Sequence, residues 1–439
     1  MTAFITRRGT LRGAGAVAAS ATLAGPALLD WAHAWAQTQP FEPEKGAHLR
    51  LTRWQRFIAA EDASFMRQVD AFTKATGVAV RVESESFEDI RTKSAVAANV
   101  GTGPDMIWTL FADAHLFPEK MVDVTDVAQY LGNKYEGWYP LAQKYGMYHR
   151  RWIAIPIAVG GNYINYRVSW VKEAGFDKFP TDMDGFMKLA KALKARDHPM
   201  GFALGNASGD ANAWTHWMLW TFGGKMVDEK DHVVINSPET VQALEYTKEL
   251  AENFIPGTAS WLDPSNNKAF LDQQISVTNN GISIYVVAKT DKMPFADDID
   301  HAFYPIGPVG KPTELHVIFP MLIYKYSKYP KAAKALTAFL LESKQQDDWL
   351  EAAQAYLTQT LKAYAKHRVW TEDPKRTVFR EATERSLDIG YAGSLGYAAA
   401  GVFADFVVVN MFADVAVGGL SAKDAAAKAE KRAERYYKV

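Results

Sequence analysis

The pattern that most constrains the fold lies in residues 49–111, where three strand-like runs alternate with two helical segments. In the first helical segment Phe65, Val69 and Phe72 recur at helical spacing, and Gly77 stands where that helix would end. The strand-like runs are residues 49–54, 78–84 and 104–111. Alternation of this kind within about sixty residues predicts parallel βαβ units and an α/β fold.

The length of the chain predicts a second lobe. A single hydrophobic core stops growing at roughly 250–300 residues, and this chain has 439. Two further strand-like runs surround Gly160 and Gly161 within residues 151–176. Residues 273–287 resemble a strand followed by a turn, and residues 301–325 are extended and broken by Pro and Gly. The remainder of the chain has mainly helical periodicity.

The N-terminal residues predict export. Paired arginines in "TRRGTLR" (6–12) precede an uncharged Ala- and Gly-rich run at 13–29 and two small-x-small sites ending at Ala34 and Ala36. This is the layout of a secretory signal peptide, and its apolar run is too short and weakly apolar to span a membrane. We therefore exclude residues 1–36 from the expected fold and expect cleavage near Ala34 or Ala36, with the mature protein in the periplasm. The arginines match a twin-arginine export signal except at Thr10; a general secretory leader is the alternative.

Composition narrows the function further. The chain has no cysteine, which excludes disulfides, thiolate metal sites and cysteine nucleophiles. Basic and acidic residues number 49 and 50, so no electrostatic footprint for nucleic acid is expected. The ten histidines lack metal-site spacing, and no nucleophile-elbow or phosphate-loop motif is complete. We expect a protein that is not an enzyme, with no cofactor and no metal.

Aromatic and amide side chains are the candidate binding residues. Trp54 and Trp108 fall at or near the ends of predicted strands, where ligands of open α/β sheets bind. Sugar rings stack on aromatic faces, and amides exchange hydrogen bonds with hydroxyls. Trp214, Trp217 and Trp220 recur at helical spacing, so at least two of them are expected in the core.

Five segments, in this order, resemble the extracellular solute-binding proteins of bacterial ABC importers, in the group with maltose-type sugar-binding proteins. Asn165-Tyr166 and Lys172, after Pro156 and before the helix start at Pro180-Thr181, carry the most specific part of the likeness. The segments are the exported leader, "GTGPDMIW" (101–108), residues 155–193, "AFLDQQISVTNNG" (269–281) and residues 390–429.

The resemblance implies a two-lobed α/β periplasmic binding protein fold, with a ligand cleft between the lobes and a hinge of about three chain crossings. The crossings would lie near 158–162, 305–312 and 350–370, with Gly160 and Gly161 supplying backbone freedom. One lobe would comprise residues 45–158 and 308–355, and the other residues 159–307 and 356–439. Carried over position by position, the implied ligand contacts are Trp54, Gln55, Trp108, Thr109, Gly161, Asn162, Asn212, Trp214, Asn280, Tyr285, Tyr391, Gly393 and Ser394.

The expected function is capture of a small carbohydrate or polyol by hinge closure, followed by delivery to the permease subunits of an inner-membrane ABC transporter. The protein is expected to act as a monomer. One alternative is an anionic sugar derivative, clamped by Arg53 or Arg56 beside Trp54. A less favoured alternative is an exported carbohydrate-active enzyme, which needs a carboxylate pair across the cleft. A structural adhesin, which would have no cleft, is the third.

Overall fold

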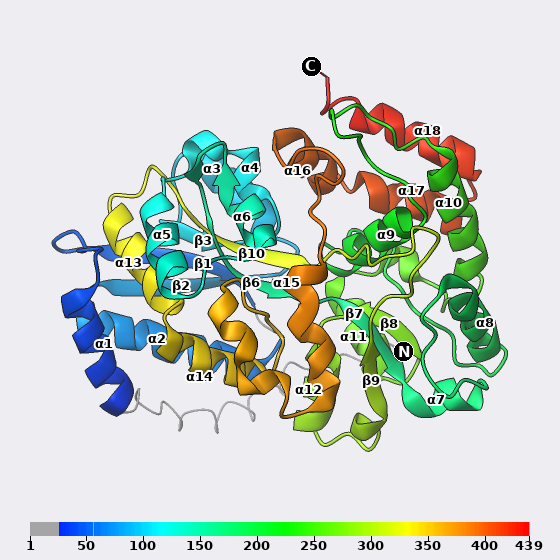
Figure 1. Cartoon of the computed structure of the whole chain (residues 1–439), viewed down its shortest axis with the longest axis horizontal. Helices are drawn as coiled ribbons and strands as arrows, with labels where there is room; N and C mark the ends of the chain where they lie inside the picture. Colours follow the sequence, from blue (N-terminus) through cyan, green and yellow to red (C-terminus); the bar gives the residue numbers. More distant parts are fainter. Residues whose placement is uncertain (1–25, 56, 439) are drawn as a thin grey trace, which may run out of the picture.

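The computed structural model describes residues 26–55 and 57–438 as two lobes side by side (Figure 1). The strands are β1 His48–Trp54, β2 Ala79–Glu85, β3 Met106–Trp108, β4 Met147–Tyr148, β5 Arg151–Trp152, β6 Ile155–Gly160, β7 Tyr163–Arg167, β8 Val277–Asn280, β9 Ile299–Ala302 and β10 Val317–Ile323. The helices are α1 Pro26–Thr38, α2 Ala59–Thr76, α3 Ile90–Val100, α4 Asp113–Leu116, α5 Thr125–Lys134, α6 Pro140–Gly146, α7 Val168–Glu173, α8 Met183–Lys194, α9 Asp210–Thr221, α10 Pro238–Ala251, α11 Asp263–Leu271, α12 Ser283–Thr290, α13 Pro330–Leu340, α14 Ser343–Ala353, α15 Ala382–Arg385, α16 Tyr397–Ala404, α17 Val407–Ala416 and α18 Ala422–Ala433.

The first lobe is built on a five-stranded sheet with the order β2-β1-β3-β10-β6. β1 pairs in parallel with both β2 and β3, which confirms the βαβ units predicted from residues 49–111. Gly77 ends α2 in the left-handed conformation at φ 75°, as its position in the sequence predicts. β10 returns from far along the chain and pairs antiparallel with β3 and β6. All seven β10 residues are buried, so this strand forms the centre of the lobe's core.

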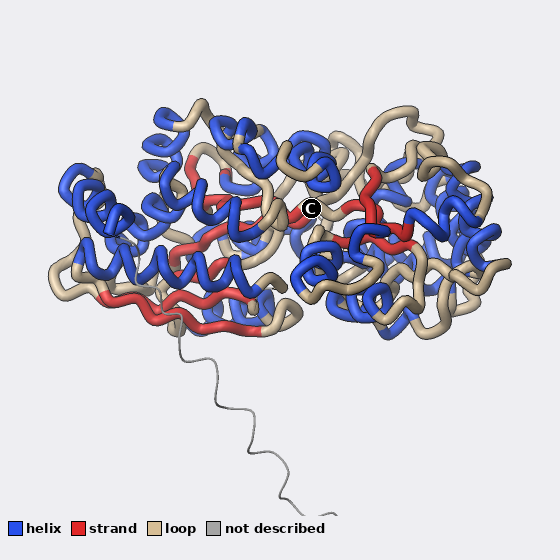
Figure 2. The backbone as a smooth tube through the Cα atoms, turned by 90° about the horizontal axis from the view of Figure 1, so that it is seen from below, coloured by secondary structure: helices blue, strands red, loops and turns tan. Residues whose placement is uncertain are grey.

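The second lobe contains a three-stranded antiparallel sheet with the order β8-β7-β9. Figure 2 shows the strands of the two sheets as separate groups, each surrounded by helices. Residues 283–290 form helix α12 rather than continuing the strand-and-turn segment predicted for 273–287. The β-branched residues of that segment favour a strand, but α12 packs against α11, and this tertiary contact decides its structure.

Three segments of the chain pass between the lobes. β6 ends at Gly160 and β7 begins at Tyr163, so the chain leaves one sheet and enters the other within a few residues. The second segment, residues 303–316, joins β9 to β10. The third follows α14, where Thr358 bridges Val159 and Ser386 bridges Glu314. The three segments therefore lie against one another, which is the arrangement of a hinge.

Helix α1 packs against α2 of the first lobe, whereas the fold expected from the sequence excludes residues 1–36. Trp35 is buried with its ring 5.0 Å from that of Phe339, and Trp35 Nε1 donates a hydrogen bond to Glu342 Oε1 at 3.1 Å. Leu28 and Ala32 are buried on the same face of the helix. Cleavage near Ala34 or Ala36 would therefore cut through a packed helix. The paired arginines and residues 13–25 lie outside the described residues.

A truncation tests this packing. A protein that begins at Gln37 should lose about 3–5 kcal/mol of unfolding free energy relative to one that begins at Pro26, because Phe339 loses the apolar cover of Leu28 and Trp35. Urea unfolding measures the difference. Replacing exposed His33 with Ala in the longer protein is the control and should change the free energy by less than about 0.5 kcal/mol. Equal stability of the two truncations would show that α1 is dispensable.

Residues 397–416 form a 20-residue segment that is long and apolar enough to cross a membrane by length and composition. Within the molecule, however, most of the apolar window in that segment is buried. The helix is also interrupted, since α17 begins after Phe406, which has a positive φ of 51°. α17 packs against α9, α10 and α18, which accounts for its apolar composition as core of the second lobe.

Candidate functional site

A small cavity lies between the lobes at the hinge, and we call it the interlobe cavity. Its volume is about 40 Å³. A ligand site for a small organic molecule typically has roughly 300–1,000 Å³, so the described conformation has room for no more than a water or two. The lining residues are Phe57, Phe87, Gly160, Gly161, Asn162, Gly209, Asp210, Asp263, Asn280, Gly281, Ser283, Val317, Phe319 and Tyr356.

The wall of the interlobe cavity on the five-stranded-sheet side is aromatic. Phe319 comes from β10 and Phe87 follows the end of β2. The ring of Trp54, at the end of β1, stacks on Phe319 with centroids 4.4 Å apart and meets Phe87 edge-on at 6.0 Å. Trp54 is fully buried behind these two rings. It therefore supports the wall without lining the cavity.

The opposite wall is polar and is organised by Asn162. Asn162 Nδ2 donates to Asp210 Oδ1 at 2.6 Å, and Asn162 Oδ1 accepts from Asn279 Nδ2 and Tyr304 Oη, each at 2.7 Å. Asn280 Nδ2 donates to Asn267 Oδ1 at 2.7 Å. These amides come from the first crossing and from β8, so the polar wall is fixed to the hinge.

Two buried carboxylates stand side by side in the polar wall. Asp263 Oδ1 accepts from the backbone N–H groups of Gly209 and Asp210 at 2.9 and 2.8 Å, and so caps the N-terminus of α9. Asp263 Oδ2 is buried and has no hydrogen-bond partner. Burial, and then the charge of Glu88, raise the pKa of Asp263, and burial and the charge of Asp263 raise the pKa of Asp210 well above its usual value.

A chain of buried hydrogen bonds joins the polar wall to all three crossings. The backbone N–H of Asn162 donates to His316 Nδ1 at 3.0 Å, so the proton of the neutral ring lies on Nε2, 3.1 Å from Glu314 Oε2. Arg385 Nη2 donates to Glu314 Oε1 at 2.6 Å. Because Asn162, Glu314 and Arg385 belong to different crossings, this chain fixes the crossings relative to one another.

Three of the residues implied by the sequence line the interlobe cavity: Gly161, Asn162 and Asn280. Neither Gly160 nor Gly161 has a positive φ, so the expected role of backbone freedom is not what the structure shows. A Cβ on Gly160 would lie 2.8 Å from the Phe319 ring, and one on Gly161 would lie 3.0 Å from the Phe379 ring. Close packing accounts for both glycines.

The structure places the other implied contacts away from the interlobe cavity. Trp108 and Thr109 are core residues beneath the aromatic wall, where Thr109 Oγ1 donates to Asp113 at 2.6 Å. Asn212 and Trp214 point into the core of the second lobe and donate to the backbone oxygens of Ser208 and Ala203. Gln55 is exposed at the end of β1. The helical spacing of the tryptophans is consistent with Trp214 as core.

The last four implied contacts, from Tyr285 onward in the chain, also lie away from the interlobe cavity. Tyr285 is buried on α12 and donates to Asp373 at 2.8 Å. Tyr391 contacts Trp220, and the backbone N–H of Ser394 donates to Asp231, beside Gly393. None of these four implied residues is among the lining of the interlobe cavity.

Sequence reasoning missed Asp210, Asp263 and the aromatic wall. Phe87 follows the carboxyl end of a predicted strand, so the rule that drew attention to Trp54 applies equally to Phe87. Asp263 precedes Pro264 at the start of a helix. An acidic residue at such a position is commonly interpreted as stabilising the helix start, with no role in binding. Phe319 gives no such signal, because it lies inside an apolar strand that pairs with segments remote in sequence.

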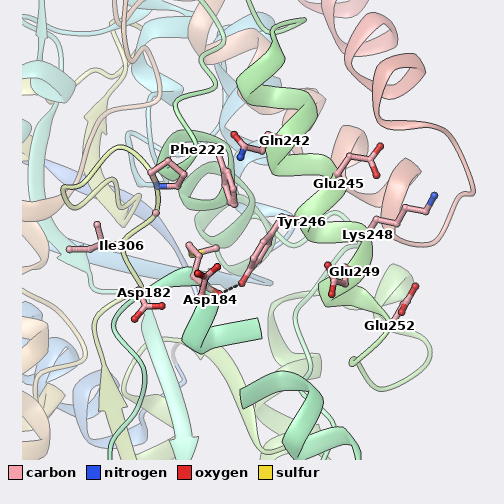
Figure 3. A pocket seen from close by; sticks show the side chains of 13 residues that line it. Asp182, Asp184, Phe222, Gln242, Glu245, Tyr246, Lys248, Glu249, Glu252 and Ile306 are labelled. Atoms are coloured by element: carbon pink, nitrogen blue, oxygen red, sulfur yellow. Dashed lines mark hydrogen bonds between the residues drawn. The ribbon is translucent and has the colours of Figure 1, made fainter. Parts of the chain in front are cut away.

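A larger hollow lies on the outer face of the second lobe, and we call it the lateral groove (Figure 3). It has a volume of about 860 Å³ between the start of α8 and α10, and Tyr246 Oη donates to the backbone oxygen of Met183 at 2.6 Å at its floor. Asp184, Glu245 and Glu249 line it. Because all of its residues belong to this lobe or to the nearby second crossing, closure of the lobes does not cover it. The interlobe cavity is the better candidate site.

The described residues hold no group of three or more His, Cys, Asp or Glu side chains placed to bind a metal ion. The chemistry available at the interlobe cavity is therefore stacking, hydrogen bonding and negative charge. These are means of binding a solute between two lobes.

Comparison with known proteins identifies the family of this chain. A family model described as bacterial extracellular solute-binding protein matches residues 67–378. A probable ABC transporter-binding protein of Deinococcus radiodurans is 23% identical over 301 residues, which are 63% of this chain and 68% of that protein.

Solved structures share the fold. Maltose-bound MalE3 of T. maritima has a TM-score of 0.76 at 20% identity, covering 89% of this chain and 100% of that one. A solute-binding protein of an ABC transporter from Agrobacterium radiobacter K84, in complex with ribitol, has a TM-score of 0.70 at 18% identity over 89% and 98% of the two chains. The chain belongs to the bacterial extracellular solute-binding proteins, as the solute-binding component of an ABC transporter.

Proposed function

We propose that this protein captures a small sugar or polyol in the interlobe cavity and presents it to the permease of an ABC importer. The observation that carries the proposal is the pairing of an aromatic wall on one lobe with an amide and carboxylate wall on the other. Rings bind the C–H faces of a polyhydroxylated ligand, and amides and carboxylates bind its hydroxyls. The related structures with maltose and ribitol support this ligand class.

Capture requires the lobes to separate and close again. The described cavity of about 40 Å³ is too small for a sugar, so the hinge must open before a ligand enters. The ligand then contacts both walls only when the lobes close over it, and this differential contact shifts the population toward a ligand-bound closed form. Asn162, Asp210, Asp263, Asn280 and the rings of Phe87 and Phe319 are the proposed contacts.

The family supports a proposal for the cellular setting. We propose that the protein works in the periplasm as a monomer, without a cofactor, after export by an N-terminal signal of the twin-arginine type. The permease subunits of the importer are the proposed partners. We place the end of the exported leader before Pro26, because α1 is packed into the first lobe. N-terminal sequencing of the secreted protein determines the cleavage point.

The rival functions lack support at the interlobe cavity. No Lys or Arg is among its lining residues in the described part of the chain, and Arg53 is fully buried and bonded to Glu61 at 2.9 Å, which disfavours an anionic ligand. Arg56 lies outside the described residues. Asp210 and Asp263 are adjacent on one wall, whereas glycoside hydrolysis needs carboxyl groups on two sides of the scissile bond. Binding without catalysis is the better account.

A thermal-shift screen of neutral sugars and polyols tests the proposal, followed by calorimetry on each compound that stabilises the protein. A ligand at 100 times its dissociation constant should add about 2.7 kcal/mol of stability. Phe319→Ala should weaken the identified ligand at least tenfold, because stacking area is lost from the aromatic wall. The control Phe222→Ala removes a ring from the lateral groove and should leave affinity unchanged. The opposite pattern would place the site in the lateral groove.

A further inference from the structure

The interlobe cavity holds two buried carboxyl groups whose ionised forms a neutral sugar cannot stabilise, and burial raises the pKa of both. Asp210 and Asp263 line it, each about 5% exposed. The amides of Asn162 and Asn266 satisfy Asp210 through neutral hydrogen bonds at 2.6 and 2.8 Å. Asp263 Oδ2 is buried without a partner. Two adjacent carboxyl groups are therefore held out of water with no cation among the lining residues.

One carboxylate of the other lobe, outside the cavity lining, acts on Asp263. Glu88, directly after Phe87 in the loop before α3, has a buried Oε1 with no hydrogen-bond partner, and its charge raises the pKa of Asp263. Arg91, on the first turn of α3, donates from Nε to Asp113 at 2.8 Å, while its Nη2 is buried without a hydrogen-bond partner. Tyr304, the other titratable group against Asp210, is neutral near pH 7, and burial raises its pKa further above the ordinary value.

The aromatic wall faces this charge. A protonated amine between ring faces and carboxylates gains a cation–π interaction and charge-assisted hydrogen bonds at once. A hydroxyl donates one hydrogen bond but brings no positive charge that would stabilise an ionised carboxyl group. The described residues also offer no metal-holding cluster, so an organic cation fits better than a metal ion.

We propose that the ligand of the interlobe cavity is a polyhydroxylated molecule that carries a protonated amine, of the amino-sugar or amino-polyol class, with the amine bound at Asp263 Oδ2. The proposal rests on the function proposed above and narrows its substrate class. The hydroxyls bind the amides of Asn162 and Asn280, and the carbon skeleton lies against Phe87 and Phe319.

Calorimetry with three matched probes separates the two proposals. D-Glucamine carries an amine and hydroxyls, D-sorbitol carries hydroxyls alone, and n-hexylamine carries an amine alone. At pH 7 we expect glucamine to bind about 30-fold more tightly than sorbitol. Sorbitol binding as tightly as glucamine overturns the amine inference and leaves the sugar or polyol function standing. Binding of hexylamine alone supports the amine site and contradicts the polyhydroxylated ligand. If neither glucamine nor hexylamine binds, the amine inference is overturned.

The variant Asp263→Asn tests whether the carboxyl group of Asp263 binds the amine of the ligand. Asparagine keeps an oxygen to cap α9 but removes the charge, so glucamine affinity should fall at least tenfold while sorbitol affinity stays within threefold. The control Asp184→Asn removes an exposed carboxylate from the lateral groove and should leave both affinities unchanged. Glucamine should also release protons on binding, and its affinity should rise from pH 5 to pH 8, because the carboxyl groups ionise while an alkylamine stays protonated. An unchanged glucamine affinity in Asp263→Asn, or affinity that falls with pH, contradicts the assignment.

Discussion

Replacing Asn162 with Ala should weaken ligand binding about 100-fold and lower the free energy of unfolding by about 3 kcal/mol. Asn162 holds Asp210 Oδ1, Asn279 Nδ2 and Tyr304 Oη at 2.6–2.7 Å, and all of these atoms are buried. Alanine leaves them without that partner, and the position of Asp210 in the cavity wall is no longer fixed. Calorimetry measures the affinity, and urea unfolding measures the stability.

Asn212 provides the matched control for Asn162. It is equally buried, but its amide donates only to the backbone oxygen of Ser208 within α9 and does not line the interlobe cavity. Asn212→Ala should therefore lower stability by about 1 kcal/mol and leave affinity within twofold. Equal losses of affinity in the two variants would show that binding depends on the stability of the second lobe rather than on the polar wall.

Replacing Arg385 with Ala should lower the free energy of unfolding by about 3–5 kcal/mol, because it leaves the carboxylate of Glu314 buried without its cation. Glu314 is 1% exposed, and Arg385 donates to it from both Nε and Nη2. The guanidinium also lies 3.9 Å from the centroid of the Phe303 ring. Since Arg385 and Glu314 belong to different crossings, removal of their ion pair also weakens the contact between the crossings at the hinge.

The ion pair between Glu314 and Arg385 also affects how the stability of the protein depends on pH. Burial alone would raise the pKa of Glu314, but the hydrogen bonds from His316 and Arg385 and the charge of Arg385 outweigh it and hold the pKa below its usual 4.5. A lowered folded-state pKa stabilises the protein above about pH 4.5 and loses that contribution as the pH falls through the folded value. Arg385→Ala should therefore flatten the acid limb of the stability curve.

Arg380→Ala is the control for Arg385→Ala. Arg380 is exposed on the same segment of the chain, so its loss should change stability by less than about 0.5 kcal/mol and preserve the acid limb. A similarly small change in Arg385→Ala would mean that Glu314 is protonated or hydrated in the folded protein.

Local sequence patterns predicted the elements of the first lobe but only part of the site. Asn162 and Asn280 could be predicted because they lie in segments that resemble the family, one at a chain crossing and the other at the end of a strand. Asp263 was missed because its partners, Gly209 and Asp210, lie more than fifty residues away in the sequence. Trp108 was misplaced because a residue at the end of a strand faces either the cavity or the core, and only the packing of α14 and Trp349 decides between them.

The small volume of the interlobe cavity has a consequence for the kinetics of capture. A sugar does not fit between the two walls of the described cavity, so productive binding requires the lobes to separate first. At low concentration the observed association rate should rise in proportion to solute, and at high concentration it should level off at the opening rate. The rate at which solute reaches the importer would then be limited by the rate of hinge opening, even when the solute is abundant.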